Sequence, residues 1–338
     1  MSWFINSSEE TFSSIFYYIH SRRKHFYSKM MATTFLANLS ISISSESWFI
    51  PSDVFMLFCN TLSIIFAIFF LLCIIADKTC HTVPMMLVAN TCLSALLVGC
   101  CLFSYSAFTL HNDIKQIVYE DLFCVARTYI KYSVYSSFNY SFGLQSLYRY
   151  LIVVKPTHLL FQSFKFQGLL VFITWLITLI FPLPFLLLGS ITYDGNNQIC
   201  MVPFRLSFSL IYLTLGMYMI PVSMTMFIYF KLIRYVHGMN KRITTANMIS
   251  RAQRELKMVR RTVILVTILL TLGLIMIVFV CMSFFIPPPK YYFRFGFICS
   301  DLSLSLVMIV LYHFTDPLKI SIQKRIDARK NRVITITR

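Results

Sequence analysis

The sequence predicts an all-α membrane protein, a seven-transmembrane helix bundle with a short amphipathic helix after the seventh span. Of its 338 residues, 57% are hydrophobic and only 13% are charged, whereas about a quarter of the residues in a soluble domain are charged. The apolar residues occur in runs long enough to cross a hydrocarbon core about 30 Å thick as helices. These runs are continuous and do not alternate with polar residues, which disfavours a membrane β-barrel.

Seven segments have the length and composition of a membrane-spanning helix. They are Val54–Ala76, Val83–Phe108, Leu122–Val154, Gly168–Leu188, Leu206–Phe230, Val263–Ile286 and Phe295–Phe314. Five of them contain no charged residue. The third contains Arg127, Lys131 and Arg149, and the seventh contains Asp301. Because a charge at membrane depth is costly without a partner, we expect Arg127, Lys131 and Asp301 to face the interior of the bundle.

The spans divide the chain into three parts. Residues 1–53 are predicted to be an extracellular N-terminal segment, 54–315 the membrane domain, and 316–338 a cytoplasmic amphipathic helix and tail. In the last part, Leu318 and Ile322 lie on one side of a helix and basic residues lie elsewhere. This pattern is typical of a helix on the inner leaflet, where basic residues meet anionic lipid.

Basic residues predict how the bundle is oriented. Nine Lys or Arg residues lie between Lys231 and Arg261, against Glu255 alone. Short loops rich in Lys and Arg stay in the cytoplasm, so with seven crossings the N-terminus is outside. The glycosylation sequons at Asn6 and Asn38 agree with that side. The net charge of +17 indicates orientation in a membrane more than nucleic-acid binding, because the basic residues flank apolar runs.

Two of the ten cysteines lie on the predicted extracellular side. Cys124 opens the third span, and Cys200 lies in the loop after the fourth. The other eight fall within spans or at the inner face, where small apolar filling is the preferred interpretation. Because extracellular thiols oxidise, we predict one structural disulfide, Cys124–Cys200.

Arg149 lies 25 residues beyond Cys124, at the inner end of the same predicted helix, within Leu147-Tyr148-Arg149-Tyr150. Here the chain resembles the rhodopsin-like (class A) G-protein-coupled receptors, in which an outer Cys and an inner Asp-Arg-Tyr have this separation. The resemblance covers essentially residues 50–330. The other matching positions are Asn60, Trp175, Pro221, Tyr229, Glu255 and Tyr312.

Several positions depart from the pattern of that family. Tyr148 replaces the acid that normally precedes the arginine, and Ala95 stands in place of the family's aspartate in span two. The segment Met308–Tyr312 lacks the Asn-Pro of span seven, and residues 273–275 (Gly-Leu-Ile) replace the Trp-x-Pro of span six. We therefore predict no sodium site, because its oxygen ligands are missing. The chain resembles a divergent, orphan invertebrate-type member of the family.

The resemblance places a ligand cavity between the outer halves of the spans. Arg127, Lys131 and Tyr135 recur every four residues on one face of span three, and Asp301 of span seven lies across the cavity from Lys131. Tyr132 is a further candidate cavity residue. The usual amine-binding aspartate is absent, since Lys131 stands at its place, and span seven holds no lysine for a retinal Schiff base. A monoamine ligand is therefore not expected.

Two interpretations of the charges in this cavity remain open. In the first, Lys131 and Asp301 form an ion pair that joins spans three and seven, while Arg127 extends toward the outer water. In the second, Arg127 and Lys131 receive an anionic group of a ligand, and Asp301 holds Lys131 in place. The ion pair is the favoured interpretation of the two.

At the inner face, the resemblance implies a set of residues that couple the bundle to a G protein. Glu255 is the remaining acidic partner for the arginine, because the acid that precedes it is missing. The candidate coupling residues are Tyr148, Arg149, Tyr150, Tyr229, Glu255 and Tyr312.

The function predicted from these observations is a G-protein-coupled receptor in the plasma membrane. Its predicted partners are an extracellular ligand, anionic or peptide, a heterotrimeric G protein and membrane lipids. No metal-ligand spacing, phosphate loop or catalytic motif occurs, so we predict neither enzymatic activity nor a cofactor. The alternatives are a transporter or channel, disfavoured by the few polar residues at mid-membrane depth, and a receptor descendant that no longer signals.

Overall fold

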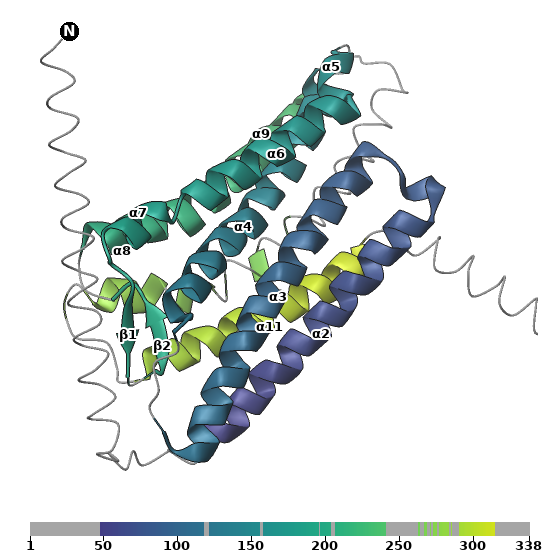
Figure 1. Ribbon diagram of the computed structural model, residues 1–338. Coiled ribbons are helices and arrows are strands. Elements are labelled where there is room, and N and C mark those ends of the chain that lie inside the picture. The colour runs from purple at the N-terminus through teal and green to yellow at the C-terminus, as the bar shows by residue number, and fades with distance from the viewer. Residues whose placement is uncertain are drawn as a thin grey trace, which may run out of the picture. The chain divides into compact units, whose positions relative to one another are not determined.

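Long helices dominate this computed structural model of the chain (Figure 1). The structure describes residues 48–117, 122–155, 158–195, 197–203, 207–240 and 291–314, together with scattered positions between 263 and 285. All of these residues belong to one compact unit, Glu46–Arg338.

The elements follow one another in an almost entirely helical order. The long helices are α2 (Phe49–Ala76), α3 (Val83–Lys115), α4 (Cys124–Val154), α6 (Phe164–Ile180), α9 (Ile220–Asn240) and α11 (Tyr292–Phe314). The short helical elements are η1 (Lys78–Cys80), α5 (Leu159–Gln162), α7 (Leu183–Leu187), α8 (Phe208–Thr214) and the π-helical turn η2 (Leu215–Met219). Strands β1 (Thr192–Asp194) and β2 (Ile199–Met201) form an antiparallel hairpin.

These helices confirm the predicted all-α membrane fold. Helices α2, α3, α6 with α7, α8 with α9, and α11 are long and apolar enough to cross a membrane. Helix α4, with 31 residues, matches the third predicted span and carries its charged residues. The sixth predicted span falls in the partly described stretch 263–285, whose described positions are mostly helical.

Three helices are longer than predicted at the same end of the bundle. Helix α2 begins at Phe49, α3 continues to Lys115, and α11 begins at Tyr292. The predicted boundaries were set by the first and last apolar residues. The helices extend past them because the polar residues at these ends, such as Asp53 and Asp113, are buried within the bundle and not exposed to water.

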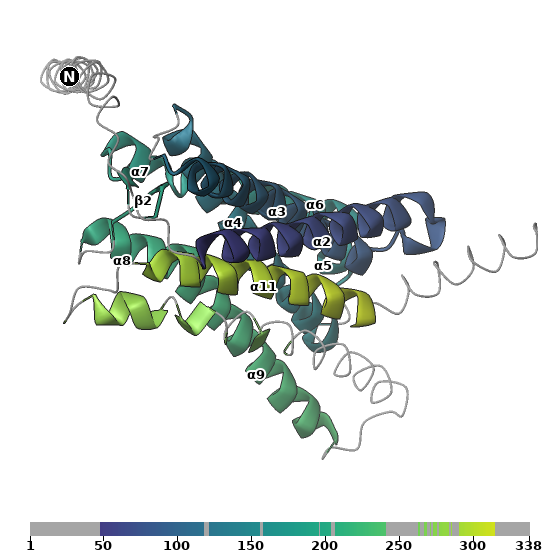
Figure 2. The same cartoon turned by 90° about the horizontal axis from the view of Figure 1, so that it is seen from below.

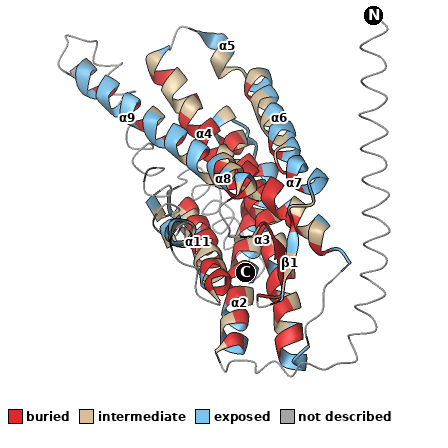
Figure 3. Ribbon diagram, turned by 90° about the vertical axis from the view of Figure 1, so that its left-hand side faces the viewer, coloured by how far each residue is buried: buried red, intermediate tan, exposed pale blue. Residues whose placement is uncertain are grey.

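Helix α4 is the central helix of the described bundle. It packs against α3, α6 and α9, and α2 lies side by side with both α3 and α11 (Figure 2). Helix α6 is peripheral (Figure 3). In the apolar stretch formed by α6 and α7, 17% of the residues are buried, against 56% in that of α3. The large exposed apolar side chains of α6 would face lipid, which is as apolar as they are.

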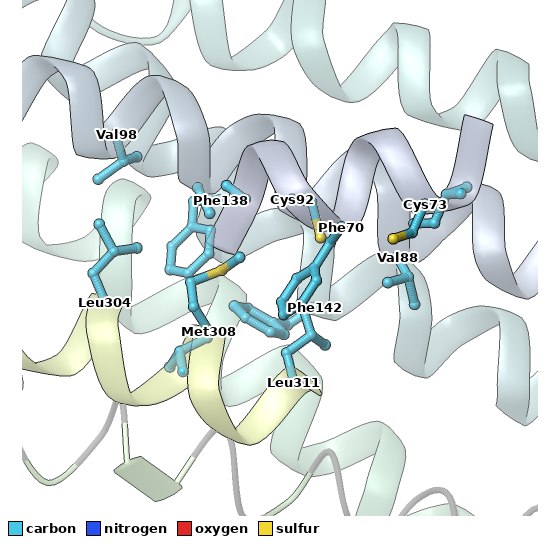
Figure 4. Close-up of a cluster of buried hydrophobic side chains, with 14 of the residues drawn as sticks. Phe70, Cys73, Val88, Cys92, Val98, Phe138, Phe142, Leu304, Met308 and Leu311 are labelled. Atoms are coloured by element: carbon cyan, nitrogen blue, oxygen red, sulfur yellow. The ribbon is translucent and has the colours of Figure 1, made fainter. Parts of the chain in front are cut away.

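The main core lies where α2, α3, α4 and α11 meet (Figure 4). Phe70 of α2, Phe138 and Phe142 of α4, and Met308 of α11 are all at most 2% exposed. Phe138 and Phe142 meet edge to face, with ring centroids 5.1 Å apart, a favoured arrangement of aromatic rings.

Small hydroxyl residues bring the helix backbones close together around this core. The hydroxyls of Ser63 in α2 and Ser305 in α11 are 3.0 Å apart, and those of Ser94 in α3 and Ser137 in α4 are 3.2 Å apart. Helices in lipid associate through such small residues and interhelical hydrogen bonds, because burial of apolar surface gives no advantage there.

Candidate functional site

The disulfide Cys124–Cys200 joins the first turn of α4 to strand β2, with the two Cα atoms 5.6 Å apart. This confirms the predicted pairing. Two hydrogen bonds add to it: the Thr128 hydroxyl donates to the Cys200 carbonyl at 2.8 Å, and the Val202 amide donates to the Tyr132 hydroxyl at 3.2 Å. The hairpin is therefore fixed over one end of α4, which we call the disulfide end of the bundle. The opposite end, where Arg149 lies, we call the arginine end.

Lys131 lies in an aromatic cage near the disulfide end. Its ammonium is 4.6 Å from the ring centroid of Tyr105, 4.8 Å from that of Phe297 and 5.3 Å from that of Tyr132. The residue is 7% exposed. Cation–π attraction to desolvated rings offsets part of the cost of burying the charge.

The predicted ion pair between Lys131 and Asp301 is not formed. The fully buried Asp301 instead accepts a hydrogen bond from the amide of Asn60 on α2, at 3.1 Å, and its Oδ1 has no hydrogen-bond partner among the described residues. The physical reason is that each charge has a nearer partner, the aromatic rings for Lys131 and the Asn60 amide for Asp301.

The other predicted cavity residues are only partly brought together. The half-buried Arg127 lies 5.6 Å from the ring centroid of Tyr105 and 5.3 Å from that of Phe108, so Arg127 and Lys131 share Tyr105. Tyr132 uses its hydroxyl to hold the hairpin. Tyr135 lies deeper, half-buried against Phe138.

A buried ionic cluster, which sequence analysis did not identify, lies beside this cage. The Arg294 guanidinium is 2.7 Å from an Asp113 carboxylate oxygen and 3.3 Å from an Asp53 oxygen, and it lies 3.9 Å from the ring centroid of Phe49. Gln198 of the hairpin donates to Asp113 at 2.8 Å. This ionic cluster (Asp53, Asp113, Arg294) joins α2, α3, α11 and the hairpin.

The three residues of the ionic cluster lie just outside the predicted spans in the sequence. Asp53 immediately precedes the first predicted span, and Arg294 immediately precedes the seventh. Asp113 lies beyond the end of the second predicted span, Val83–Phe108. A charged residue next to a span usually faces water, and only the longer helices of the structure bring these three together.

A small cavity separates the ionic cluster from the cage. The residues that line it include Asp53, Arg294, Asn197, Tyr105 and Phe297. The volume open to the centre of a water molecule is about 20 Å³. That is room for roughly one or two water molecules. The cavity has unpaired polar atoms within reach, because Asp53 Oδ2 and Asn197 Oδ1 have no hydrogen-bond partner among the described residues.

At the arginine end, the residues around Arg149 lie on the last turns of α4. Tyr148 is buried in an apolar cluster with Leu87 and Ile152, so it packs α4 against α3. In the family's pattern, this position holds the acid that precedes the arginine. Tyr150 packs against the cluster around Tyr229 of α9. Arg149 itself is half-buried.

The remaining predicted residues are partly outside the described chain. Tyr312 is half-buried and stacks on Phe70, with ring centroids 5.8 Å apart. Glu255, the sequons Asn6 and Asn38 and the predicted amphipathic helix after span seven lie outside the described residues.

Pro221 disrupts the backbone hydrogen bonding of span five, and α4 compensates. Proline has no amide N–H to donate, so the Gly216 and Met217 carbonyls of the π-helical turn need other donors. The Tyr140 hydroxyl donates to Gly216 at 3.2 Å, and the Asn139 amide donates to Met217 at 2.8 Å. Span five is thereby held against α4.

We expect Asn139→Ala to lower the stability of the receptor by about 1–3 kcal/mol, because it leaves the Met217 carbonyl unsatisfied in a buried site. Thermal unfolding of the purified protein in detergent measures this. Asn139→Ser gives a shorter donor and should fall between the wild type and the alanine variant. If both variants unfold like the wild type, the Asn139 bond does not support span five.

The fold and the site together define a class of protein. Apolar helices that cross a membrane repeatedly, tied by a disulfide between α4 and a hairpin, make this a multi-pass helical membrane protein. In addition, the Trp175 indole of α6, one of the positions that carry the resemblance, donates to Asn90 of α3 at 2.9 Å.

Comparison with known proteins gives the family. The model of the seven-transmembrane receptors of the rhodopsin family matches residues 66–309, so the chain belongs to that family. No curated protein matches the sequence. Among solved structures, squid rhodopsin is similar in fold, with a TM-score of 0.68 and 12% sequence identity over 84% of this chain and 86% of that one.

Proposed function

We propose that the protein is a plasma-membrane receptor whose disulfide end faces outward and binds an extracellular ligand. Its arginine end then activates a heterotrimeric G protein in the cytoplasm. Membership of the rhodopsin family supports this proposal. So does the concentration of basic residues between Lys231 and Arg261, which would stay in the cytoplasm together with Arg149.

The observation that carries the proposed ligand site is the pair of buried charges near the disulfide end. The Lys131 ammonium is surrounded by aromatic faces, and Asp301 has an oxygen without a hydrogen-bond partner among the described residues. Buried charges in a membrane domain are costly and are typically retained where function uses them. A ligand that satisfies the Lys131 ammonium would gain a charge-assisted hydrogen bond in a dry environment.

The ligand class that fits best carries an anionic group, such as a carboxylate or phosphate, either on a small molecule or on a peptide. Arg127 lies one turn closer to the disulfide end and adds a second positive charge beside Tyr105. A monoamine would bring a like charge toward Lys131, which is unfavourable at short range in low dielectric.

We expect Lys131→Met to weaken the response to an anionic ligand by about tenfold to a hundredfold, the value of a hydrogen bond to a charged group. The measurement is a dose–response curve for G-protein activation in cells exposed to short-chain mono- and dicarboxylates and acidic peptides. Lys115→Met is the matched control, because Lys115 is an exposed lysine at the same end of the bundle. Equal potency in the two variants contradicts the assignment of Lys131.

We expect Arg149→Ala to reduce basal nucleotide exchange on an added heterotrimeric G protein to background, because it removes the charge that meets the G protein. Lys155→Ala, at the same end but exposed, is the control and should exchange nucleotide like the wild type. Absence of exchange in the wild type as well, with normal surface delivery, would show a receptor descendant that does not signal. Solute or ion flux would instead show a transporter or channel.

A further inference from the structure

Span six contains a glycine whose side-chain space is filled from span five. A β-carbon added to Gly273 would overlap the hydroxyl and ring edge of Tyr218. The ring of Tyr218 therefore occupies the volume that any larger residue at position 273 would need. Two other glycines differ in this respect, since a β-carbon at Gly168 or Gly238 would meet no atom within 4 Å.

The π-helical turn brings Tyr218 to this position. A π-helical turn contains one more residue than an α-helical turn and rotates the side chains that follow it. Tyr218 lies within that turn, whose carbonyls at Gly216 and Met217 are held by Tyr140 and Asn139 of α4. The direction of the Tyr218 ring is thus fixed by α4 through the backbone of span five.

Tyr218 is also close to the ligand-facing side of α4. The Asn139 amide of α4 donates to the carbonyl of the neighbouring residue Met217 at 2.8 Å, and Asn139 lies one helical turn from Tyr135. Tyr135 lies one helical turn from Lys131 and packs against Phe138. The π-helical turn that contains Tyr218 therefore lies between this part of α4 and Gly273 of span six.

We propose that Tyr218 is the positioning residue that links the ligand-facing side of α4 to span six, by seating its ring on Gly273. A ligand that displaces α4 near Tyr135 would move the π-helical turn that Asn139 holds, and the Tyr218 ring would then shift against Gly273. The link to signalling rests on the proposed function, whereas the seating of the ring on Gly273 does not.

A double-mutant cycle on thermal stability in detergent tests the seating. In the wild-type background, Gly273→Ala should lower the Tm by about 3–8 °C, because the added methyl group displaces the ring. In the Tyr218→Ala background the same change should leave the Tm unchanged or raise it, since the space is vacant and alanine favours the helix. The control Gly168→Ala should have one small effect in both backgrounds. Equal losses for Gly273→Ala in both backgrounds would overturn the seating.

Basal nucleotide exchange on an added G protein tests the link to signalling. Tyr218→Ala removes the seated ring and Gly273→Ala displaces it, so each variant should change the exchange rate at least about threefold, in the same direction. Tyr218→Phe keeps the ring, so its exchange rate should stay within twofold of the wild-type rate. Wild-type rates in all three variants, with Arg149→Ala still inactive, would overturn the link while leaving the proposed function intact. Absence of exchange in the wild type would overturn both the proposed function and the link, and the stability cycle would then decide the seating alone.

Discussion

Arg294→Met is expected to prevent the receptor from reaching the cell surface in a folded form, with a loss of about 3–5 kcal/mol, the cost of breaking a buried ion pair on one side. Methionine approximates the length of the arginine stem and can still contact Phe49, so the change isolates the charge. Without the guanidinium, which contacts both carboxylates, Asp53 and Asp113 would repel each other at close range. Surface immunolabelling and thermal unfolding in detergent measure the loss.

The triple variant Asp53→Asn, Asp113→Asn, Arg294→Met is the control for this prediction. It removes all three charges together. Replacing a buried ion pair or triad with uncharged side chains of similar volume often changes the free energy of unfolding little. We therefore expect the triple variant to recover most of the surface delivery that Arg294→Met loses. If the triple variant behaves like the single one, the contribution of Arg294 lies in packing and not in charge.

The order and approximate limits of the spans could be predicted because hydrophobic length is a local property of the chain. A run of apolar residues of sufficient length identifies a span wherever its neighbours lie. The pairing of Cys124 with Cys200 was also predictable, because topology alone places both on the oxidising side. These predictions required no knowledge of how the helices pack.

The ends of the helices could not be predicted in this way. Asp53, Asp113 and Arg294 are residue types that are typical of solvated helix ends, yet in the structure they are buried and paired with one another. Their pairing depends on contacts between residues up to 241 positions apart, which no local pattern encodes.

The site was predictable in depth and face but not in its contacts. The four-residue spacing places Arg127, Lys131 and Tyr135 on one side of α4, as observed. It did not reveal that Asn60 lies nearer to Asp301 than Lys131 does, nor that Tyr132 holds Val202 of the hairpin. Those outcomes depend on side-chain orientation and on neighbours from other helices.

The second large effect is expected from the disulfide: Cys124→Ser should release the hairpin and abolish the response to any ligand that binds beneath it. The two cysteines are 76 positions apart, and closing a loop of that length is worth about 4.5 kcal/mol in the chain-entropy model. This value is an upper limit, because helices that remain inserted in the bilayer already restrict the loop.

Two comparisons separate the bond from the loss of a cysteine side chain. Cys100→Ser changes a free and exposed cysteine on α3 and should leave surface delivery and ligand response unchanged. The double variant Cys124→Ser, Cys200→Ser should be no worse than either single variant, because each single change already breaks the same bond. Additive losses in the double variant would show that each residue acts separately. The hairpin would then depend on Thr128 and Tyr132, whose hydrogen bonds remain when the disulfide is removed.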